Sequence, residues 1–426
     1  MTAVTSETLF RNVRVFDGVS AQVSEPSDVL VRDGVIEAVS RSPVAAVADG
    51  ATRAELDGGG RVLMPGLIDA HWHSMFATLP LQALTTADVG YVNIVAAREA
   101  EATLQRGFTT VREAGGPVFG LKLAIDQALV AGPRIYPAGA MISQTSGHGD
   151  FRFPFELPRG VCGNLAHTER IGAAVIADGV AEVLRGVREQ LRLGATQIKV
   201  MAGGGVASSY DPIDVTQYTE AELRAAVDAA SDWGTYVMVH AYTPAAVQRA
   251  LRAGVRSIEH GHLLDSETVA MIAERDAWWC PQPFLDDEDK VSVPPTSEWK
   301  LERILEGTER AYGLARTHGV NLAWGSDTLF DARLTTRQGA QLAKLTRWFG
   351  AAEVLTLATS ANAQLCALSG ERNPYPGVLG EVRAGAIADL LLVDGDPVAD
   401  IDLLADPAAN LVAIMKGGVI HKNTLA

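Results

Sequence analysis

The sequence predicts an α/β protein, a parallel (β/α)8 barrel with a small β-sandwich domain built from both ends of the chain. Three observations support this fold class. Apolar strand-like runs alternate with helical patterns from residue 64 onward, both chain ends carry only short β-like runs and turns, and polar residues end several of the predicted strands. The 426 residues provide enough length for a barrel and a second domain.

Both ends of the chain have the same β-like character. The runs 9–16, 27–32 and 35–40 are separated by turns such as Asp33-Gly34, and the runs 385–393 and 411–415 near the other end are followed by a hairpin turn at 416–419. Chain termini often lie close together in space. We therefore predict that residues 1–63 and 370–426 form one β-sandwich domain and that residues 64–369 form the catalytic barrel inserted between them.

Eight strand–helix units follow one another in the central region. The predicted strands are 63–71, 109–113, 134–142, 196–201, 236–240, 257–260, 277–281 and 321–325. The predicted helices are 93–105, 119–130, 173–193, 220–233, 244–253, 267–275, 298–317 and 338–348. An open doubly wound sheet is the alternative, but the Gly-x-Gly-x-x-Gly pattern after an early strand is missing. The longest connections, 143–170, 202–219, 282–296 and 326–337, all follow strands, where barrel enzymes build their sites.

Composition and charge restrict the classes of partner. Lys and Arg total 36 against 51 Asp and Glu, a net charge of −15, which argues against nucleic acid and anionic membranes. No run of about 18 apolar residues and no signal peptide is visible. The three widely spaced cysteines fit a reducing compartment. We expect a cytoplasmic protein with a small-molecule substrate. The sequence leaves open whether the chain forms a homo-oligomer.

The first predicted barrel strand ends in His71-Trp72-His73. Alternate side chains of a strand point to the same face, so both imidazoles aim the same way. Two converging imidazoles supply half of a zinc site, whereas a His-x-His pair on its own also occurs on solvated strands or in cores.

Four further residues stand at the ends of predicted strands four, five, six and eight: Lys199, His240, His260 and Asp327. Each alone has a simpler interpretation, as a core or cap histidine, an ion-paired lysine or a turn-capping aspartate. Together with His71 and His73 they converge on one mouth of the barrel, and this arrangement predicts a metal centre.

The stretch Pro65-Gly-Leu-Ile-Asp-Ala-His-Trp-His73, combined with these strand-end residues, resembles the amidohydrolase superfamily and its TIM-like metal-dependent hydrolase barrel. The resemblance covers nearly the whole chain. Further motifs resemble the imidazolonepropionase-related branch, which contains Xaa-Pro dipeptidases and other N-acyl amino acid hydrolases. They are Gly-Phe-Thr-Thr-Val-Arg at 107–112, Ser-Gly-His-Gly-Asp at 146–150, Ile-Lys-Val-Met-Ala-Gly-Gly at 198–204, His-Ala-Tyr at 240–242 and Ile-Glu-His-Gly at 258–261.

This resemblance implies a centre of two divalent metal ions, usually zinc. It assigns the more buried ion to His71, His73 and Asp327 and the other to His240 and His260. Lys199 would bridge the two ions as a carbamate formed with CO2. A metal-bridging hydroxide would attack the scissile carbonyl, with Asp327 taking its proton and passing it to the leaving nitrogen. The alternative is that Asp327 serves only as a ligand.

The same resemblance suggests the residues that contact substrate. His148 would stabilise the oxyanion or contact a carboxylate, and Tyr242 would donate its hydroxyl to a substrate carboxylate. Arg152 and Arg159 are weaker candidates for the carboxylate. The remaining histidines, 167, 262, 318 and 421, are interpreted as structural or surface residues. Cys162 and Cys280 are expected to be inert.

The resulting prediction is a zinc-dependent hydrolase that cleaves an amide in a dipeptide or an N-acyl amino acid. The same centre could act on a cyclic amide, lactone, carbamate or phenylurea-type xenobiotic, because one hydroxide serves all of these reactions. A metal-free scaffold protein on the same fold is a third possibility, although such a protein is expected to have lost ligands.

Overall fold

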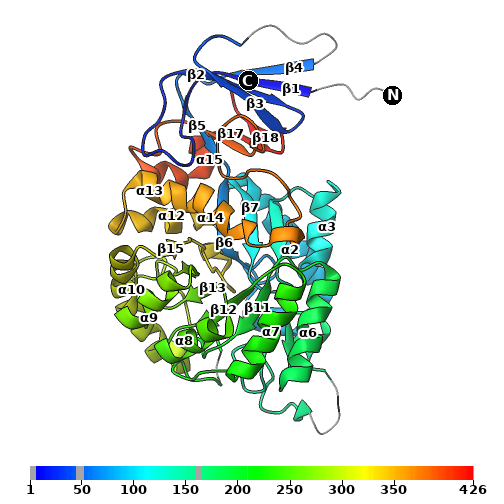
Figure 1. Ribbon diagram of the computed structural model, residues 1–426. Helices are drawn as coiled ribbons and strands as arrows, with labels where there is room; N and C mark the ends of the chain where they lie inside the picture. The colour runs from blue at the N-terminus through cyan, green and yellow to red at the C-terminus, as the bar shows by residue number, and fades with distance from the viewer. Residues whose placement is uncertain (1–5, 45–51, 160–162, 164, 209, 426) are drawn as a thin grey trace.

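The computed structural model describes residues 6–44, 52–159, 163, 165–208 and 210–425. Cys162 lies outside them. Figure 1 shows two parts, a β-rich domain that contains the first and last strands, and below it a barrel whose helices surround the central strands.

The β-rich domain is the predicted β-sandwich, and its strands join both chain ends. Its strand order is β18-β17-β16-β5-β1-β2-β3, and β4 pairs with β1. The bounds are β1 (Ser6–Val15), β2 (Ser27–Arg32), β3 (Val35–Ser40), β4 (Thr52–Asp57), β5 (Val62–Pro65), β16 (Leu390–Val393), β17 (Leu411–Lys416) and β18 (Val419–Asn423). β5 runs parallel to β1 and antiparallel to β16, so the predicted pairing of the two ends is confirmed. The division at 63/64 and 369/370 stays a proposal.

Parallel strands form the wall of the barrel. They are β6 (Leu67–Trp72), β7 (Phe108–Glu113), β8 (Arg134–Pro137), β9 (Met141–Ser143), β11 (Ile198–Met201), β12 (Val237–Ala241), β13 (Ser257–His260), β14 (Trp278–Cys280) and β15 (Asn321–Leu322). The assigned ladders form a seven-stranded sheet from β10 (Ala174–Ile176) to β15 and a three-stranded sheet β6-β7-β8. Backbone hydrogen bonds from Ala70 N to Trp324 O (3.1 Å) and from Asp327 N to His71 O (2.9 Å) close the wall between first and last strands.

Helices cover the outside of the wall (Figure 1). The α-helices are α1 (Leu81–Thr86), α2 (Val89–Gln105), α3 (Phe119–Asp126), α5 (His167–Arg170), α6 (Val180–Leu193), α7 (Glu220–Asp232), α8 (Pro244–Ala253), α9 (Ser266–Glu274), α10 (Glu298–His318), α11 (Ala332–Thr335), α12 (Gln338–Ala343), α13 (Ala351–Thr356), α14 (Asn362–Ala367) and α15 (Pro407–Asn410). Short helical turns at Pro295–Ser297, Lys344–Arg347, Gly370–Arg372 and Ile401–Ala405, and a π-turn at Leu357–Ala361, complete the described elements. None of the described helices is long and apolar enough to cross a membrane.

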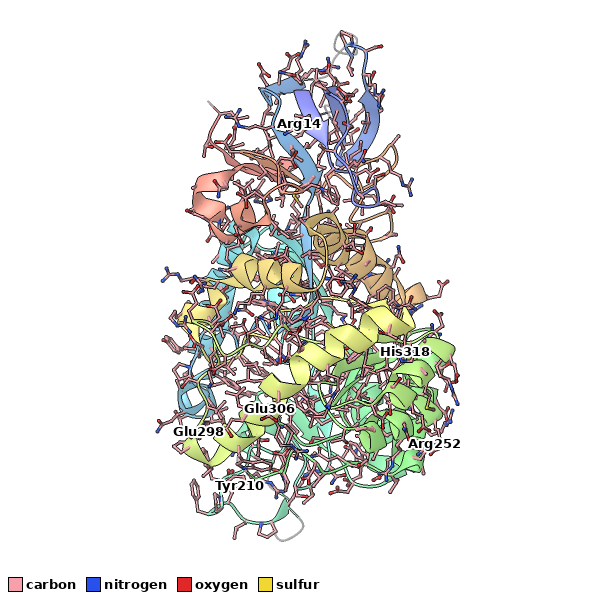
Figure 2. All side chains as sticks on the ribbon, turned by 90° about the vertical axis from the view of Figure 1, so that its left-hand side faces the viewer. Arg14, Tyr210, Arg252, Glu298, Glu306 and His318 are labelled. Carbon is pink, nitrogen blue, oxygen red and sulfur yellow. The ribbon has the colours of Figure 1, made fainter. Side chains whose placement is uncertain are left out.

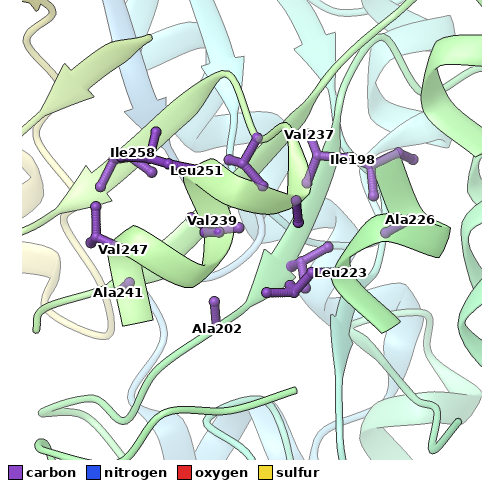
Figure 3. Close-up of a cluster of buried hydrophobic side chains, with 14 of the residues drawn as sticks. Ile198, Ala202, Leu223, Ala226, Val237, Val239, Ala241, Val247, Leu251 and Ile258 are labelled. Atoms are coloured by element: carbon purple, nitrogen blue, oxygen red, sulfur yellow. The ribbon is translucent and has the colours of Figure 1, made fainter. Parts of the chain in front are cut away.

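The largest apolar core lies between the barrel strands and α6–α10. Figure 3 shows Val237 and Ile258 of the strands facing Leu223 of α7 and Val247 and Leu251 of α8. These side chains are almost fully buried, so the helices fix the strands whose ends carry the predicted site.

Several predicted element boundaries were wrong. The first predicted strand, 63–71, is two strands, β5 in the β-rich domain and β6 in the barrel. The run 134–142 is two strands, because Gly139 adopts a positive φ of 74° and the side chain of Gln190, rather than a neighbouring strand, accepts the hydrogen bond of Ala140 N (2.9 Å). The helix expected at 173–193 starts only at Val180, since residues 174–176 pair with β9.

The eighth strand is shorter than expected. After Leu322 the ladder ends, and the Asn362 side chain accepts the hydrogen bond of Trp324 N (3.1 Å) and donates to Trp324 O and Ile68 O (2.7 Å each). A side-chain amide therefore replaces part of the backbone pairing at the closure of the barrel.

Candidate metal centre

The structure brings all the predicted strand-end residues to one cavity of about 350 Å³. Its lining includes the six proposed ligands and the two proposed substrate contacts, namely His71, His73, Lys199, His240, His260, Asp327, His148 and Tyr242. All but Asp327, which is slightly more exposed, are buried. The carboxyl ends of the strands thus form the bottom of the cavity, and the long loops that follow the strands supply its rim.

Asp327 stands at the centre of the cluster. Its Oδ1 atom lies 3.3 Å from His71 Nε2 and 3.4 Å from His73 Nε2, and its Oδ2 atom lies 3.6 Å from His260 Nδ1. Lys199 Nζ is 3.3 Å from His71 Nε2. One further imidazole completes the group, because the ring centroids of His240 and His260 are 4.5 Å apart.

The two imidazoles of the first strand are each anchored through Nδ1. His71 Nδ1 lies 2.7 Å from Oε2 of Glu259, and His73 Nδ1 lies 2.9 Å from the carbonyl oxygen of Gly115. Both partners accept hydrogen bonds only, so Nδ1 carries the proton and Nε2 of the neutral ring presents a lone pair. Those lone pairs lie 3.3 and 3.4 Å from Oδ1 of Asp327, and a cation bound between them would stabilise this arrangement.

The other two imidazoles are anchored in a complementary way. His240 Nε2 lies 3.1 Å from the carbonyl oxygen of Gly204, which leaves Nδ1 for a ligand. His260 Nδ1 lies 2.7 Å from Oε1 of Gln282, whose amide nitrogen donates to Cys280 O (3.0 Å), which leaves His260 Nε2. Every one of the four rings therefore has one fixed N–H and one free nitrogen, the donor set that a divalent transition metal requires.

Burial keeps these groups in the protonation states that metal ligands need. It lowers the pKa values of His71 and His240 far below the ordinary value and that of His260 to about 3. Burial also lowers the pKa of Lys199 to about 8, against the opposing effect of Glu259 and Asp327. The imidazoles of His71, His240 and His260 are thus neutral, and the Lys199 amine reaches its neutral form at a mildly alkaline pH.

Glu259 is itself held by a buried arginine. Arg112 Nη2 lies 2.9 and 2.8 Å from the two oxygens of Glu259, and Arg112 Nε donates to Ala70 O (2.6 Å), next to His71. Burial disfavours the charge of Arg112, but Glu259 outweighs that effect and raises its pKa. This ion pair links β6, β7 and β13 beneath the cavity.

Asp69, like Arg112 and Glu259, lies beneath the cavity, and it connects the first and last strands of the barrel. Its carboxylate accepts hydrogen bonds from His71 N (3.0 Å), Ser326 Oγ (2.6 Å) and Gln338 Nε2 (2.8 Å). The strands approach so closely here that a Cβ at Gly325 would stand 2.3 Å from His71 N. Asp69 thereby sets the distance between His71 and Asp327.

Two of the proposed ligands adopt unusual backbone conformations. The φ angles of His260 and Asp327 are 71° and 49°, in the left-handed region that most side chains avoid. Trp279 Nε1 supports the first by donating to His260 O (2.8 Å), and Asp327 N donates to His71 O. Such conformations concentrate at functional sites, where the surrounding structure holds them.

His148 and Tyr242 form one wall above the cluster. The His148 ring stacks on His240 with centroids 4.1 Å apart, and Tyr242 stacks on His260 at 5.1 Å. The Tyr242 hydroxyl has no hydrogen-bond partner among the described residues. Apolar side chains supply most of the remaining wall, among them Phe76, Phe151, Phe284, Leu301, Ile304 and Phe330.

Arg152 and Arg159 do not line this cavity. Both line a larger outer cavity of about 1500 Å³, where Arg152 pairs with Asp150 at 2.5 Å and Arg159 lies 3.4 Å from Glu169. The other four histidines also stay away from the cluster; His262, the nearest, is buried and its Nε2 lies 2.8 Å from Gln282 O. Cys280 is fully buried, and burial raises the pKa of its thiol.

Sequence reasoning missed the residues that orient the histidines, above all Glu259 and Gln282. A signal was present for Glu259, because a glutamate inside the apolar run of a buried strand requires a charged partner. Gln282 follows the seventh strand, and nothing in the surrounding sequence indicates that its side chain has a buried partner. The role of Glu259 and Gln282 is visible only in the folded chain, where neighbouring strands place their side-chain oxygens beside His71 and His260.

Fold and site together define a barrel hydrolase whose chemistry takes place at the carboxyl ends of the strands. A model of the amidohydrolase family matches residues 62–422, and the chain belongs to that family.

Individual relatives agree with this assignment. The chain is 32% identical over 386 residues to an ochratoxinase of Aspergillus niger, which covers 85% of this chain and 76% of that protein. The structure of a prolidase complexed with N-methylphosphonate-L-proline is 35% identical, with a TM-score of 0.89 over 98% of this chain and 100% of that one. A Xaa-Pro dipeptidase with bound methionine is 27% identical, with a TM-score of 0.84 and coverages of 98% and 100%. The resemblance to the Xaa-Pro dipeptidase-like branch is confirmed.

Proposed function

We propose that this amidohydrolase uses two divalent metal ions, zinc being the expected metal, to hydrolyse an amide bond in a dipeptide or an N-acyl amino acid. One observation carries the proposal: each of the four clustered histidines has one ring nitrogen anchored by a hydrogen bond, and the other nitrogens of His71 and His73 lie 3.3 and 3.4 Å from the Asp327 carboxylate. A divalent cation would be held by these nitrogens and the Asp327 carboxylate together.

The ligands divide between two ions. His71, His73 and Asp327 would hold the more buried ion and His240 and His260 the other. Lys199, buried between them, would bridge the ions as a carbamate, because an ammonium cannot ligate a cation whereas a carbamate offers two anionic oxygens. When bound, two divalent ions lower the pKa of a water molecule and polarise the scissile carbonyl.

Asp327 moves the proton in this scheme. As the oxygen of water adds to the carbonyl carbon, a carboxylate oxygen of Asp327 accepts the proton of that water. The C–N bond then breaks and Asp327 passes the same proton to the leaving nitrogen, which yields a carboxylic acid and an amine. The position of Asp327 beside His71, His73 and His260, three of the proposed ligands, supports this role.

The free carboxylate of the substrate would bind at the wall formed by His148 and Tyr242. The Tyr242 hydroxyl has no hydrogen-bond partner in the part of the chain that the structure describes, and burial keeps its pKa far above the ordinary value, so it stays a hydrogen-bond donor. The apolar remainder of the wall suits an apolar acyl group or side chain. The prolidase and the ochratoxinase among the relatives support an amide substrate.

A substrate panel tests this proposal. The zinc-loaded protein is assayed against Xaa-Pro dipeptides, N-acyl amino acids, lactones and aryl carbamates. We expect the highest kcat/KM among the dipeptides and N-acyl amino acids. Turnover confined to lactones or carbamates would overturn the substrate class while leaving the metal centre intact.

A further inference from the structure

His148 has a partner that the proposed reaction does not use. Its Nδ1 atom lies 3.3 Å from Oδ2 of Asp211 and 2.8 Å from Oγ of Ser208. Asp211 is 2% exposed and follows the fourth strand in the loop that begins with the three glycines 203–205. A buried carboxylate against a histidine that lines the reaction cavity determines which ring nitrogen carries the proton.

Several contacts hold Asp211 in place. Gly205 N and Gln217 Nε2 donate to Oδ2 of Asp211 at 2.9 and 3.5 Å, and Ser208 Oγ donates to Oδ1. Gln217 also accepts the hydrogen bond of His148 N (2.9 Å), so one side chain links the backbone of the histidine to the aspartate. Burial opposes ionisation of Asp211, but the hydrogen bonds from His148 and Ser208 outweigh it and lower its pKa.

A buried lysine fixes the loop itself. Lys300 of α10 is 3% exposed, and its Nζ donates to the carbonyl oxygens of Gly205 (3.1 Å), Ser208 (2.8 Å) and Asp211 (2.7 Å). Figure 2 shows Tyr210 close to the Glu298 end of α10, the end that carries Lys300. Three carbonyl groups from one short loop thus converge on a single ammonium.

The backbone at Gly205 lies so close to the His148 ring that the ring cannot move toward the loop. A Cβ at Gly205 would stand 2.0 Å from the Cε1 atom of His148. On the opposite face the ring stacks on His240. The imidazole packs against both the loop and a proposed ligand, and a 180° turn of the ring about the Cβ–Cγ bond would put Cδ2 in place of Nδ1 and lose the contacts with Ser208 and Asp211.

We propose that Asp211 is a positioning residue for His148: it fixes the proton on Nδ1 and thereby directs Nε2 to the substrate. Its carboxylate accepts hydrogen bonds only, so Nδ1 must donate, and Nε2 has no hydrogen bond to the described part of the chain. Lys300 and Ser208 keep the carboxylate in place. The proposal rests on the proposed function in one respect, the contact of His148 with substrate.

A double-mutant cycle tests whether Asp211 acts through His148. Asp211→Asn keeps the shape of the side chain and removes the pure acceptor, so we expect kcat/KM of the zinc-loaded enzyme to fall by about 10- to 100-fold. In a His148→Gln background the same change should alter kcat/KM by less than about twofold, because its target is gone. An equal loss in both backgrounds would show a merely structural role and overturn the proposal.

Nuclear magnetic resonance of 15N-histidine-labelled holoenzyme gives a second readout that does not depend on activity. The His148 signals are identified by their loss in His148→Gln. We expect Nδ1 of His148 to carry a proton in the wild type and its 15N and 1H shifts to change in Asp211→Asn but not in Asp214→Asn, an exposed aspartate of the same loop. A neutral His148 ring protonated on Nε2 would contradict the proposal.

The two readouts separate this inference from the proposed function. If no amide is hydrolysed but the shifts behave as expected, Asp211 still positions His148 and only the substrate assignment fails. If amides are hydrolysed but Asp211→Asn leaves both kcat/KM and the His148 shifts unchanged, the positioning role fails alone.

Discussion

His71 Nδ1 and Glu259 Oε2 lie 2.7 Å apart, and both side chains are completely buried. Glu259 is at the same time paired with Arg112, so its negative charge is satisfied before any metal arrives. The contact fixes the protonated nitrogen of His71 and turns the other toward Asp327 and Lys199. The geometry of the candidate centre therefore depends on a residue that is not itself a proposed ligand.

Glu259→Gln is expected to weaken zinc binding by about 10- to 100-fold, because an amide holds the His71 N–H less firmly than a carboxylate. The change also leaves the Arg112 charge unpaired, which costs about 3–5 kcal/mol of unfolding free energy. Zinc affinity is measured by competition with a chelator, and stability by chemical denaturation.

A compensating variant distinguishes the two effects of Glu259→Gln. Arg112→Met combined with Glu259→Gln removes both buried charges and should recover much of the lost stability. Zinc affinity should stay low in the double variant, since His71 has not regained its carboxylate partner. Full recovery of zinc affinity would show that Glu259 acts only on folding.

Reconstitution of the metal-free protein is expected to depend on pH through Lys199. Only the neutral amine reacts with CO2, and burial lowers the pKa of Lys199 to about 8. At constant dissolved CO2 the initial rate of activation by zinc should rise about tenfold per pH unit below pH 8 and level off above it. His71, His240 and His260 are already neutral in this range, because burial lowers their pKa values.

A rate of activation that stays constant from pH 6 to pH 9 would contradict this role of the amine. Lys199→Met is the control, because it removes the nucleophilic nitrogen while keeping an apolar chain of similar length. We expect no activation of that variant at any pH in this range. Carbon-13 resonance after addition of labelled bicarbonate reports the carbamate directly in the wild type.

Tyr242→Phe is expected to raise KM for substrates with a free carboxylate by about 10-fold or more while kcat changes little, because one hydrogen bond to a charged group is lost. The side chain is buried in the wall of the cavity, and phenylalanine preserves its stacking on His260. The matched measurement uses the same substrates with an amidated carboxyl terminus, whose KM should not respond. An equal rise in KM for both series would place the carboxylate elsewhere.

Glu113 is expected to make stability depend on pH. Its Oε2 accepts hydrogen bonds from Ser74 N (2.7 Å) and Ser74 Oγ (2.5 Å), whereas Oε1 is buried and has no partner among the described residues. Burial raises its pKa from 4.5 to about 7. The folded state therefore binds the proton more tightly than the unfolded state, so this contribution is complete below pH 4.5 and is lost as the pH rises through 7.

Glu113→Gln replaces the titrating group by a neutral one of the same shape. Relative to the wild type, its free energy of unfolding should increase by up to about 3 kcal/mol between pH 5 and pH 8, as measured by denaturation of the metal-free protein. Glu274→Gln, an exposed change at the end of α9, is the control and should show no such trend. A constant difference between wild type and Glu113→Gln across this range would contradict the assignment.

Sequence patterns were sufficient for the barrel, the pairing of the chain ends and the gathering of six candidate ligands. Five of those residues follow or end an apolar run and Lys199 lies within one, and the ends of parallel strands meet at one mouth of the barrel, so the sequence pattern was enough to predict the cluster. Strand β10 was not predictable in the same way, because its three residues resemble the start of the helix that follows. Local pattern cannot show that Ala174–Ile176 has a partner at Met141–Ser143.

The supporting residues of the site needed the structure. Glu259, Gln282, Asp69 and Asp211 act through contacts with side chains 22 to 269 positions away in the sequence. No periodicity or spacing encodes such pairs. Their effect is nonetheless to decide which nitrogen of each imidazole is free, and hence what the site can bind.

Turnover as a function of bound metal tests the central claim most directly. Metal-free protein is titrated with zinc in the presence of bicarbonate, and hydrolysis of a Xaa-Pro dipeptide or N-acyl amino acid is measured against the number of ions bound per chain. The account predicts that hydrolysis is absent without zinc and reaches its maximum only when two ions are bound. Full hydrolysis by the metal-free protein, or a maximum at one ion with no second site, would contradict it.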